Sequence, residues 1–307
     1  MITIVKPGLF TTIQDGGRWG YQAYGMPVAG AMDRYAFRVA NSLVGNEQDA
    51  AIVEMTLLGG VYHFDSDVWV SICGADMQAM LNGKSIENWS SFFVAAGSTL
   101  EFQYAVSGCR SYLAVSGGFD VPLVLGSSST YTRAGIGGLE GRSLKVGDIL
   151  FGKKPIHAMK KGKCLPTEFV PQYREEITLR VLLGPQDDLF TSEGINIFFT
   201  STYTISADAD RMGYRLEGTK IEHIGKPDIV SDALCEGAIQ VPGHGMPIVM
   251  MADRQTTGGY PKIGTVIGAD LTKLAQAKPG DRVRFIQCSD EDAVAELQRE
   301  EECSEHC

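Results

Sequence analysis

The sequence has no apolar run that approaches the roughly 20 residues a membrane-spanning helix requires. Its first residues, MITIVKPG, lack the basic and apolar regions of a secretory signal peptide. The seven cysteines are an odd number and show no framework spacing, so we expect reduced thiols rather than disulfides. We therefore expect a cytoplasmic protein.

Several motifs of common enzyme classes are also missing. The chain has no GxSxG, no HExxH and no GxGxxG spacing, which argues against serine hydrolases, zinc peptidases and dinucleotide-binding loops. Gly83-Lys84-Ser85 resembles the end of a phosphate-binding loop, but Gln78 stands where that motif requires its first glycine. Cys303, His306 and Cys307 on one terminal segment are a weak metal signal, so we predict no metal site.

A basic surface is absent as well. The net charge is −10, and residues 289–307 hold eight acids against one arginine, which leaves −3 for the rest of the chain. This balance argues against nucleic acid or an anionic membrane as a partner. Residues 290–302 are expected to form an acidic, solvated helix.

Glycine is abundant, and 36 glycines with 12 prolines favour many turns and short strands. One helix is predicted at 31–43, where apolar residues recur with helical spacing. We predict a mainly β chain with a domain at 1–152, a linker at 153–174, a second domain at 175–288 and an acidic tail at 289–307. Strands are predicted at 68–72, 77–81, 91–95, 99–104, 111–115, 177–183, 200–206, 264–267 and 282–286.

The predicted linker is rich in lysine and contains three prolines. Its HAMKKGK stretch faintly resembles the Met-Lys-Met tripeptide that carries biotin, but Lys161 follows Lys160 where methionine is required. No hairpin pattern surrounds it. We therefore predict a solvated linker and no biotin on this chain.

Residues 238–264, AIQVPGHGMPIVMMADRQTTGGYPKIG, hold the densest set of chemical groups. Two apolar runs lead into a loop of acid, base, amide, hydroxyl, phenol and ammonium groups, and its paired glycines would let backbone amides approach a ligand. The alternative is an ordinary hairpin end with solvated side chains. We predict catalytic roles for Asp253, Arg254, Tyr260 and Lys262, and substrate binding by Gln240, Gln255, Thr256, Gly258 and Gly259.

Two other polar tracts have a similar composition. TTIQDGGRWG contributes Gln14, Asp15 and Arg18, which are either part of a polar loop before the helix or a second wall of one pocket. The acid–base pair Asp210-Arg211 repeats the order of Asp253-Arg254, and each pair follows a predicted strand. Such pairs are most often structural. We nevertheless expect these loops to converge on one substrate-binding site.

Motifs along most of the chain resemble the KipA family, also described as allophanate hydrolase subunit 2 or as the C subunit of 5-oxoprolinase. The resemblance extends to the carboxyltransferase domain of biotin-dependent urea carboxylase, and it implies two cyclophilin-like β-barrel domains with a few short helices. Two positions depart from the family pattern. Ser128 stands where the family usually has arginine, and His244 stands where it usually has aspartate. The motifs are PGLFTTIQDGGRWG, RSYLAVSGGFDVPLVLGS, GGLEGRSLKVGD, VLLGPQDDLF, DRMGYRLEG and DRQTTGGYPKIG.

The resemblance implies a component of a bacterial ATP-dependent 5-oxoprolinase, which converts 5-oxoproline to glutamate. Arg254 or Lys262 would hold the substrate carboxylate, and Asp253 or Tyr260 would transfer protons. Two partners are implied: a KipI-like subunit (allophanate hydrolase subunit 1, or the B subunit of 5-oxoprolinase) and a LamB/YcsF-type subunit (the A subunit of 5-oxoprolinase). ATP is used by the complex and is not expected to bind this chain alone. The alternatives are a biotin-dependent carboxyltransferase component for an amide or urea-like substrate, and a non-enzymatic antagonist of a KipI-like kinase inhibitor.

Overall fold

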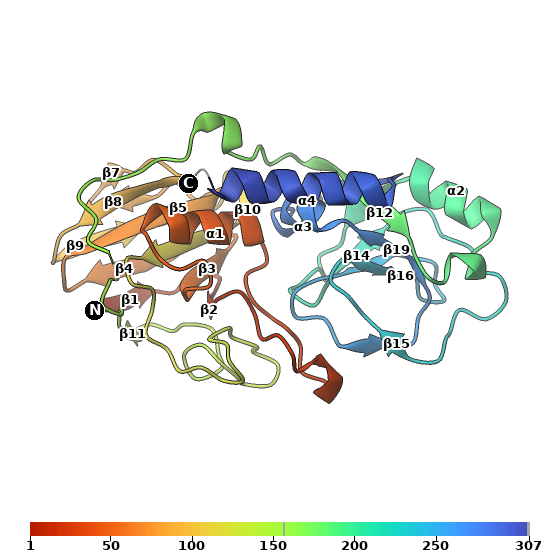
Figure 1. Cartoon of the computed structure of the whole chain (residues 1–307), viewed down its shortest axis with the longest axis horizontal. Coiled ribbons are helices and arrows are strands. Elements are labelled where there is room, and N and C mark those ends of the chain that lie inside the picture. Colours follow the sequence, from red (N-terminus) through yellow and green to blue (C-terminus); the bar gives the residue numbers. More distant parts are fainter. Residues whose placement is uncertain (156, 306–307) are drawn as a thin grey trace. The chain divides into compact units, whose positions relative to one another are not determined.

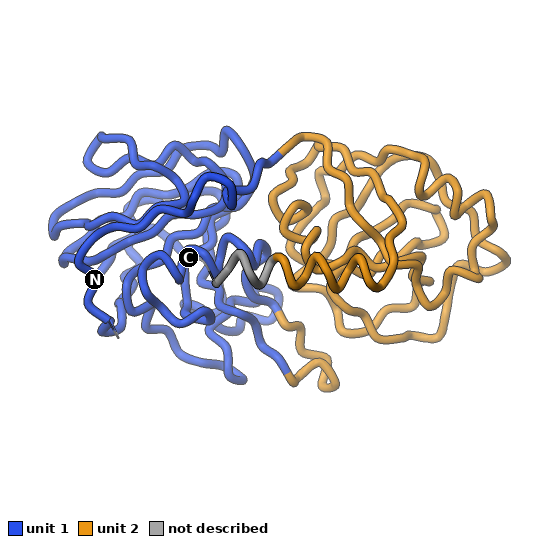
Figure 2. The backbone as a smooth tube through the Cα atoms, turned by 45° about the horizontal axis from the view of Figure 1, so that its top comes forward, with its two compact units in different colours: residues 1–19, 29–173, 303–307 blue, residues 20–28, 174–302 orange. Residues whose placement is uncertain are grey.

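The structure is a computed structural model that describes residues 1–155 and 157–305, with side chains as far as Arg299. His306 and Cys307, considered above as metal ligands, lie outside the described residues. Figure 1 shows the elements along the chain. Figure 2 shows its division into two compact units, of which unit 1 contains Met1–Trp19 and Ala29–Tyr173, and unit 2 contains Gly20–Val28 and Arg174–Glu302.

Unit 1 is built from two antiparallel sheets. The first, in spatial order, consists of β11 (Ile149–Leu150), β1 (Ile2–Lys6), β4 (Val61–Phe64), β9 (Ser98–Glu101), β6 (Met80–Leu81) and β7 (Lys84–Ser85). The second consists of β2 (Phe10–Gln14), β3 (Ile52–Thr56), β10 (Ser107–Val115), β5 (Val68–Asp76) and β8 (Ser90–Val94).

Both faces of the second sheet are buried. Successive residues of a strand point to opposite faces of the sheet, so neighbouring residues belong to different apolar clusters. Val53, Ile72 and Leu113 join the main core of unit 1 together with residues of the first sheet. Cys73 and Tyr112, one position away, join a second cluster with helix α1 (Arg34–Leu43). The sheet therefore lies between two apolar layers, one of them formed by the helix.

The predicted helix at 31–43 is confirmed but starts at Arg34 rather than at Ala31. Asp33 precedes it as the N-cap, and its Oδ1 accepts a hydrogen bond from the amide of Ala36 at 2.9 Å. The Asp33 side chain thus satisfies a backbone donor at the helix start.

The segment predicted as a solvated linker belongs to unit 1 as far as Tyr173. Leu165 is 6% exposed and lies in the α1 cluster, with Phe169 and Val170 packed against that cluster. The amide of Leu165 also donates to the carbonyl of Trp89. Isolated apolar residues among the lysines hold this segment to the unit. A 3-10 turn, η2, spans Thr167–Phe169.

Unit 2 contains a closed seven-stranded barrel. All its strand pairs are antiparallel except the parallel pair β12–β20. In spatial order the strands are β12 (Glu176–Leu183), β19 (Lys262–Val266), β16 (Ala238–Gln240), β17 (Ile248–Met250), β14 (Gly213–Glu217), β13 (Thr202–Ile205) and β20 (Arg282–Gln287).

Shorter elements complete unit 2. A two-stranded ribbon and several helices accompany the barrel, so the expectation of a mainly β chain with short helices is confirmed. The closed barrel lies in unit 2, whereas unit 1 consists of the two sheets described above. The ribbon and the helices of this unit are β15 (Asp232–Ala233), β18 (Thr257–Gly258), η1 (Gln22–Tyr24), η3 (Asp187–Leu189), α2 (Ser192–Thr200), α3 (Gly268–Ala275) and α4 (Asp290–Glu305), which belongs to unit 2 as far as Glu302.

The acidic C-terminal segment forms α4, as predicted, and an ion pair joins one of its described side chains to the barrel. Glu296 lies 3.0 Å from Arg180, which also pairs with Asp270 at 2.7 Å. The hydrogen bond from Arg180 lowers the pKa of the Glu296 carboxyl. Within the part of the chain that the structure describes, no helix is long and apolar enough to span a membrane.

Candidate functional site

The loop that follows β17 is anchored by a buried ion pair. Asp253 and Arg211 are 6% and 7% exposed, and two hydrogen bonds, 2.9 and 3.1 Å long, join the carboxylate to the guanidinium. The amide of Asp253 also donates to the carbonyl of Arg211 at 2.8 Å. The structure thus brings one residue of each acid–base pair together, and the acid of the later pair binds the base of the earlier one.

The other two cations of this loop region also bond to protein groups. Arg254 donates to the carbonyls of Leu234 and Met251. The Lys262 ammonium is buried and lies 2.5 Å from the Asp232 carboxylate, and this hydrogen bond lowers the pKa of Asp232. Both cations therefore fix the ribbon formed by β15 and β18 to the barrel wall.

A cavity of about 240 Å³ lies on the outer side of three barrel strands. Tyr214, Ile239 and Val249 point into the barrel core, so their neighbours on β14, β16 and β17 face outward. These outward residues include Arg215 and Ile248, which are direct partners across two strands. Four predicted site residues line the cavity: Asp210, Gln240, Gln255 and Tyr260.

Two further polar side chains line this cavity. Arg215 is exposed on β14, and no ion pair involving it is seen among the described residues. It was not selected from the sequence because it occupies an ordinary outward position in the GYRLE strand. His244, for which the sequence predicts no role, accepts a hydrogen bond from the amide of Met246 on Nδ1.

The cavity is shaped by close contacts of the loop that bears Tyr260. The side-chain amide of Gln240 donates through Nε2 to the backbone carbonyl of Tyr260 at 3.2 Å. A Cβ on Gly258 would lie 2.5 Å from Gln240 Nε2, so Gly258 keeps space for that amide. Asp210 accepts hydrogen bonds from the amides of Met212 and Gly213 and so orders the start of β14.

The remaining predicted residues of unit 2 do not line the cavity. Arg211, Asp253, Arg254 and Lys262 are buried beside it in the contacts described above. Three loop positions contribute backbone carbonyls or close packing instead. The carbonyls of Thr256 and Gly259 accept hydrogen bonds from the amides of Leu234 and Ile229, respectively. Gly258 packs against the side chain of Gln240.

In unit 1, the predicted residues Gln14, Asp15 and Arg18 are buried and fasten residues 124–130 to β2. Gln14 donates to the carbonyl of Thr130 at 3.2 Å. Arg18 donates to the carbonyls of Val124 and Ser129, each at 2.8 Å.

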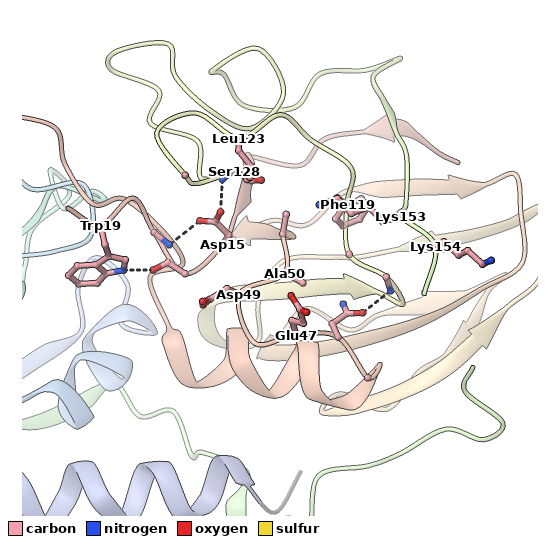
Figure 3. Close-up of a pocket in the computed structure, with 18 residues that line it drawn as sticks. Asp15, Trp19, Glu47, Asp49, Ala50, Phe119, Leu123, Ser128, Lys153 and Lys154 are labelled. Carbon is pink, nitrogen blue, oxygen red and sulfur yellow. Dashed lines mark hydrogen bonds between the residues drawn. The ribbon is translucent and has the colours of Figure 1, made fainter. Parts of the chain in front are cut away.

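Asp15 has the densest hydrogen bonding of these residues. Its carboxylate accepts hydrogen bonds from the amides of Gly17 and Ser128 and from the hydroxyls of Ser127 and Ser129. Ser127, Ser128 and Ser129, here called the serine cluster, thus donate to an internal carboxylate. Asp15 also borders a cavity of about 340 Å³ shown in Figure 3, whereas Gln14 and Arg18 do not.

The predicted site residues therefore form two groups, one in each unit. Gln14, Asp15 and Arg18 belong to unit 1, and the predicted residues from Asp210 to Lys262 belong to unit 2. Among the described residues, no group of three or more histidines, cysteines, aspartates or glutamates is placed to hold a metal ion.

The sequence matches the family model described as carboxyltransferase domain, subdomain A and B, over residues 24–287. It is 41% identical to the C subunit of 5-oxoprolinase from Escherichia coli over 294 residues, which cover 96% of this chain and 93% of that protein. The corresponding protein of Haemophilus influenzae is 37% identical and covers 98% of this chain and 96% of its own length. Urea amidolyase of Saccharomyces cerevisiae is 36% identical over 94% of this chain but only 17% of its own length.

The fold has a similar counterpart among solved structures. Urea amidolyase of Kluyveromyces lactis superposes with a TM-score of 0.94 over 99% of this chain, at 30% sequence identity. Urea carboxylase of the same yeast gives the same TM-score and identity. This chain spans 20% and 29% of the length of those two longer chains.

Proposed function

The chain belongs to the family of the carboxyltransferase domain, subdomain A and B, and from this premise we propose that it is one of the subunits of an ATP-dependent 5-oxoprolinase. The observation that carries the proposal is the sequence similarity to the C subunit of 5-oxoprolinase. The chain is 41% identical to the Escherichia coli protein and 37% identical to the Haemophilus influenzae protein, against 36% for the yeast urea amidolyase. Similarity to two proteins of the same name, over 96% and 98% of this chain, supports the role of that subunit.

The reaction is the hydrolysis of a cyclic amide. The C–N bond of 5-oxoproline breaks, water supplies the oxygen of the new carboxylate, and the leaving nitrogen takes up a proton and becomes the amine of glutamate. The hydrolysis of ATP to ADP and phosphate drives the ring opening in the complex. This chemistry requires a cation for the substrate carboxylate and hydrogen-bonding groups around the amide.

The unit 2 cavity provides these groups in the proposed site. Arg215 would hold the substrate carboxylate, because a guanidinium fork matches a carboxylate in shape and charge. Gln240, Gln255 and Tyr260 would bind the lactam carbonyl and N–H. We assign Asp253, whose carboxylate is held by Arg211, to the positioning of the loop that carries Gln255 and Tyr260. Lys262 is a positioning residue in the same sense, through Asp232.

The function is tested by measuring glutamate release from 5-oxoproline and ATP. The chain is mixed with its two proposed partners, the KipI-like protein and the LamB/YcsF-type protein, and each of the three is omitted in turn. We expect release only when all three are present, and no loss of activity when avidin is added. Release that continues without this chain would overturn the proposal.

A second candidate function is supported by the family model and by the yeast structures. In that case the chain would be part of a carboxyltransferase that moves a carboxyl group from carboxybiotin to an amide or urea-like acceptor. The same assay separates the two functions, since a carboxyltransferase requires a biotinylated carrier and would be blocked by avidin.

The site assignment predicts the effect of replacing Arg215 by glutamine. A hydrogen-bonded charge pair contributes about 1.5–3 kcal/mol to the free energy of binding. Its loss corresponds to a rise in the KM for 5-oxoproline of about 10- to 150-fold. We expect kcat to change much less, because the carboxylate takes no part in the bond that breaks. The matched control is Arg282→Gln, which removes an exposed barrel arginine that pairs with Glu176 and does not line the cavity. Equal KM values for both variants would refute the assignment.

A further inference from the structure

The cavity in unit 1 has walls of fixed backbone. Asn46 donates to the carbonyl of Val115 and accepts from the amide of Gly117, which joins the turn after α1 to the end of β10. The amide of Lys153 donates to the carbonyl of Gly118 and holds the segment after β11 against the same turn. Gly117 has φ +95°, and a Cβ there would lie 2.2 Å from the Lys153 carbonyl oxygen, so only glycine fits this junction.

Opposite charges line different parts of this cavity. Glu47 and Asp49 come from the turn between α1 and β3, and Lys153 and Lys154 follow β11. In Figure 3 the two acids lie below Asp15, and the two lysines lie to the right of it. Among the described residues, no ion pair involves any of these four side chains. The carboxylate of Asp15, by contrast, is already bonded to four internal donors.

One of the two acids, Asp49, lies beside the QDGGRWG loop. A Cβ on Gly16 would lie 2.2 Å from Oδ1 of Asp49, so this glycine gives the carboxylate room beside the backbone. Trp19 borders the same cavity and is held by a hydrogen bond from its Nε1 to the carbonyl of Gly16. The Arg34 guanidinium lies 5.2 Å from the centroid of the Trp19 ring. The indole is therefore a fixed reporter at the edge of the cavity.

We propose that this cavity binds a zwitterionic α-amino acid. Its ammonium group would lie at Glu47 and Asp49, and its carboxylate at Lys153 and Lys154. A simple anion would meet the two acids, and a simple cation would meet the two lysines. A ligand that carries both charges forms charge-assisted hydrogen bonds with both sets.

Among zwitterionic α-amino acids, we assign L-glutamate as the ligand, and this assignment rests on the proposed function. The nitrogen of 5-oxoproline is a neutral lactam amide, and it becomes an ammonium group only after the ring has opened. A site built around Glu47 and Asp49 would therefore accept the product and discriminate against the substrate. The cavity would serve as a product-binding site distinct from the substrate cavity in unit 2.

The test is a binding titration of the full chain alone, in which calorimetry and tryptophan fluorescence both detect the bound ligand. The ligands are L-glutamate, 5-oxoproline and glutarate, which keeps both carboxylates of glutamate but lacks the amine. A lost charge-assisted hydrogen bond corresponds to about tenfold or more in affinity, so we expect glutamate to bind at least that much more tightly than the other two. Equal binding of glutarate and glutamate would overturn the proposal, and so would the absence of glutamate binding.

Variants locate the binding in this cavity. Glu47→Gln with Asp49→Asn should weaken glutamate binding about tenfold or more while leaving glutarate binding unchanged, and Lys153→Gln with Lys154→Gln should weaken both. The matched control is Lys84→Gln with Glu87→Gln, two exposed charges of unit 1 outside the cavity, and it should bind as the wild type does.

Two comparisons make the result specific. Trp19→Phe should retain the calorimetric signal of binding and lose the fluorescence change. If glutamate binds both double variants of the cavity as tightly as the wild type, the proposed location of the site is wrong. Because the titration needs neither ATP nor partner proteins, it is independent of the glutamate-release assay. Binding of glycine and other α-amino acids as tightly as glutamate would support the zwitterion site and contradict only the narrower glutamate assignment.

Discussion

Replacing Asp253 by alanine is expected to lower the free energy of unfolding of unit 2 by about 3–5 kcal/mol, because the change breaks a buried ion pair. The guanidinium of Arg211 would stay buried without the carboxylate that accepts two of its hydrogen bonds. Hydrogen–deuterium exchange of the barrel strands in urea measures this loss. The three tryptophans, Trp19, Trp69 and Trp89, all lie in unit 1, so their fluorescence gives a separate measurement of that unit.

Two controls distinguish the ion pair from a general effect of mutation. Asp228→Ala removes an exposed acid of unit 2 and should change stability by less than about 0.5 kcal/mol. The double variant Arg211→Met with Asp253→Leu replaces both charges by apolar groups and should be more stable than Asp253→Ala. If Asp253→Ala unfolds at the wild-type urea concentration, the pair has no stabilising role, and Asp253 is again a candidate for proton transfer.

The second large effect is expected for Asp15→Asn. The change keeps the shape of the side chain but removes the charge that accepts hydrogen bonds from two amides and two hydroxyls. The new amide hydrogens would face these donors, so we expect a loss of about 2–4 kcal/mol in the stability of unit 1. Urea denaturation followed by tryptophan fluorescence measures it.

Asp49→Asn is the natural comparison for this second change. Asp49 lines the same cavity but is exposed, and its carboxylate takes no part in the hydrogen bonds that fasten residues 124–130. We expect its urea midpoint to remain close to that of the wild type. The same midpoint for both variants would mean that the serine cluster does not depend on the carboxylate of Asp15.

Local sequence signals located many of the elements, because turn geometry depends on a few adjacent residues. Asn82 and Gly83 have φ of 50° and 77°, and they connect β6 to β7 as the Asn-Gly pair predicts. Helix α2 was not located in the same way, since its sequence SEGINIFFT is short and rich in residues that also suit strands. Its position depends on tertiary packing, with the Phe198 ring stacked on Phe285 of β20 at 4.5 Å between centroids.

The sequence also indicated which loops carry polar groups, but it could not assign a role to each of them. Catalytic roles were predicted for Asp253 and Lys262 without knowledge of their ion pairs, because the partners, Arg211 and Asp232, lie far away along the chain. Whether a charged side chain is bonded to protein groups or available to a ligand is decided by folding, which brings such distant partners together. Arg215, which we propose as the cation for the substrate carboxylate, was not predicted from the sequence, because a polar residue at an outward strand position carries no distinctive pattern.

The place of β20 in the barrel has a consequence for the way the protein is made. This strand pairs with β12 on one side and with β13 on the other, although both are synthesised long before it. Until residues 282–287 leave the ribosome, β12 and β13 each have an unpaired edge. Such edges bind other strands readily, so a growing chain passes through a stage at which aggregation competes with folding. Translation beyond residue 287 is therefore a condition for a barrel without free edges.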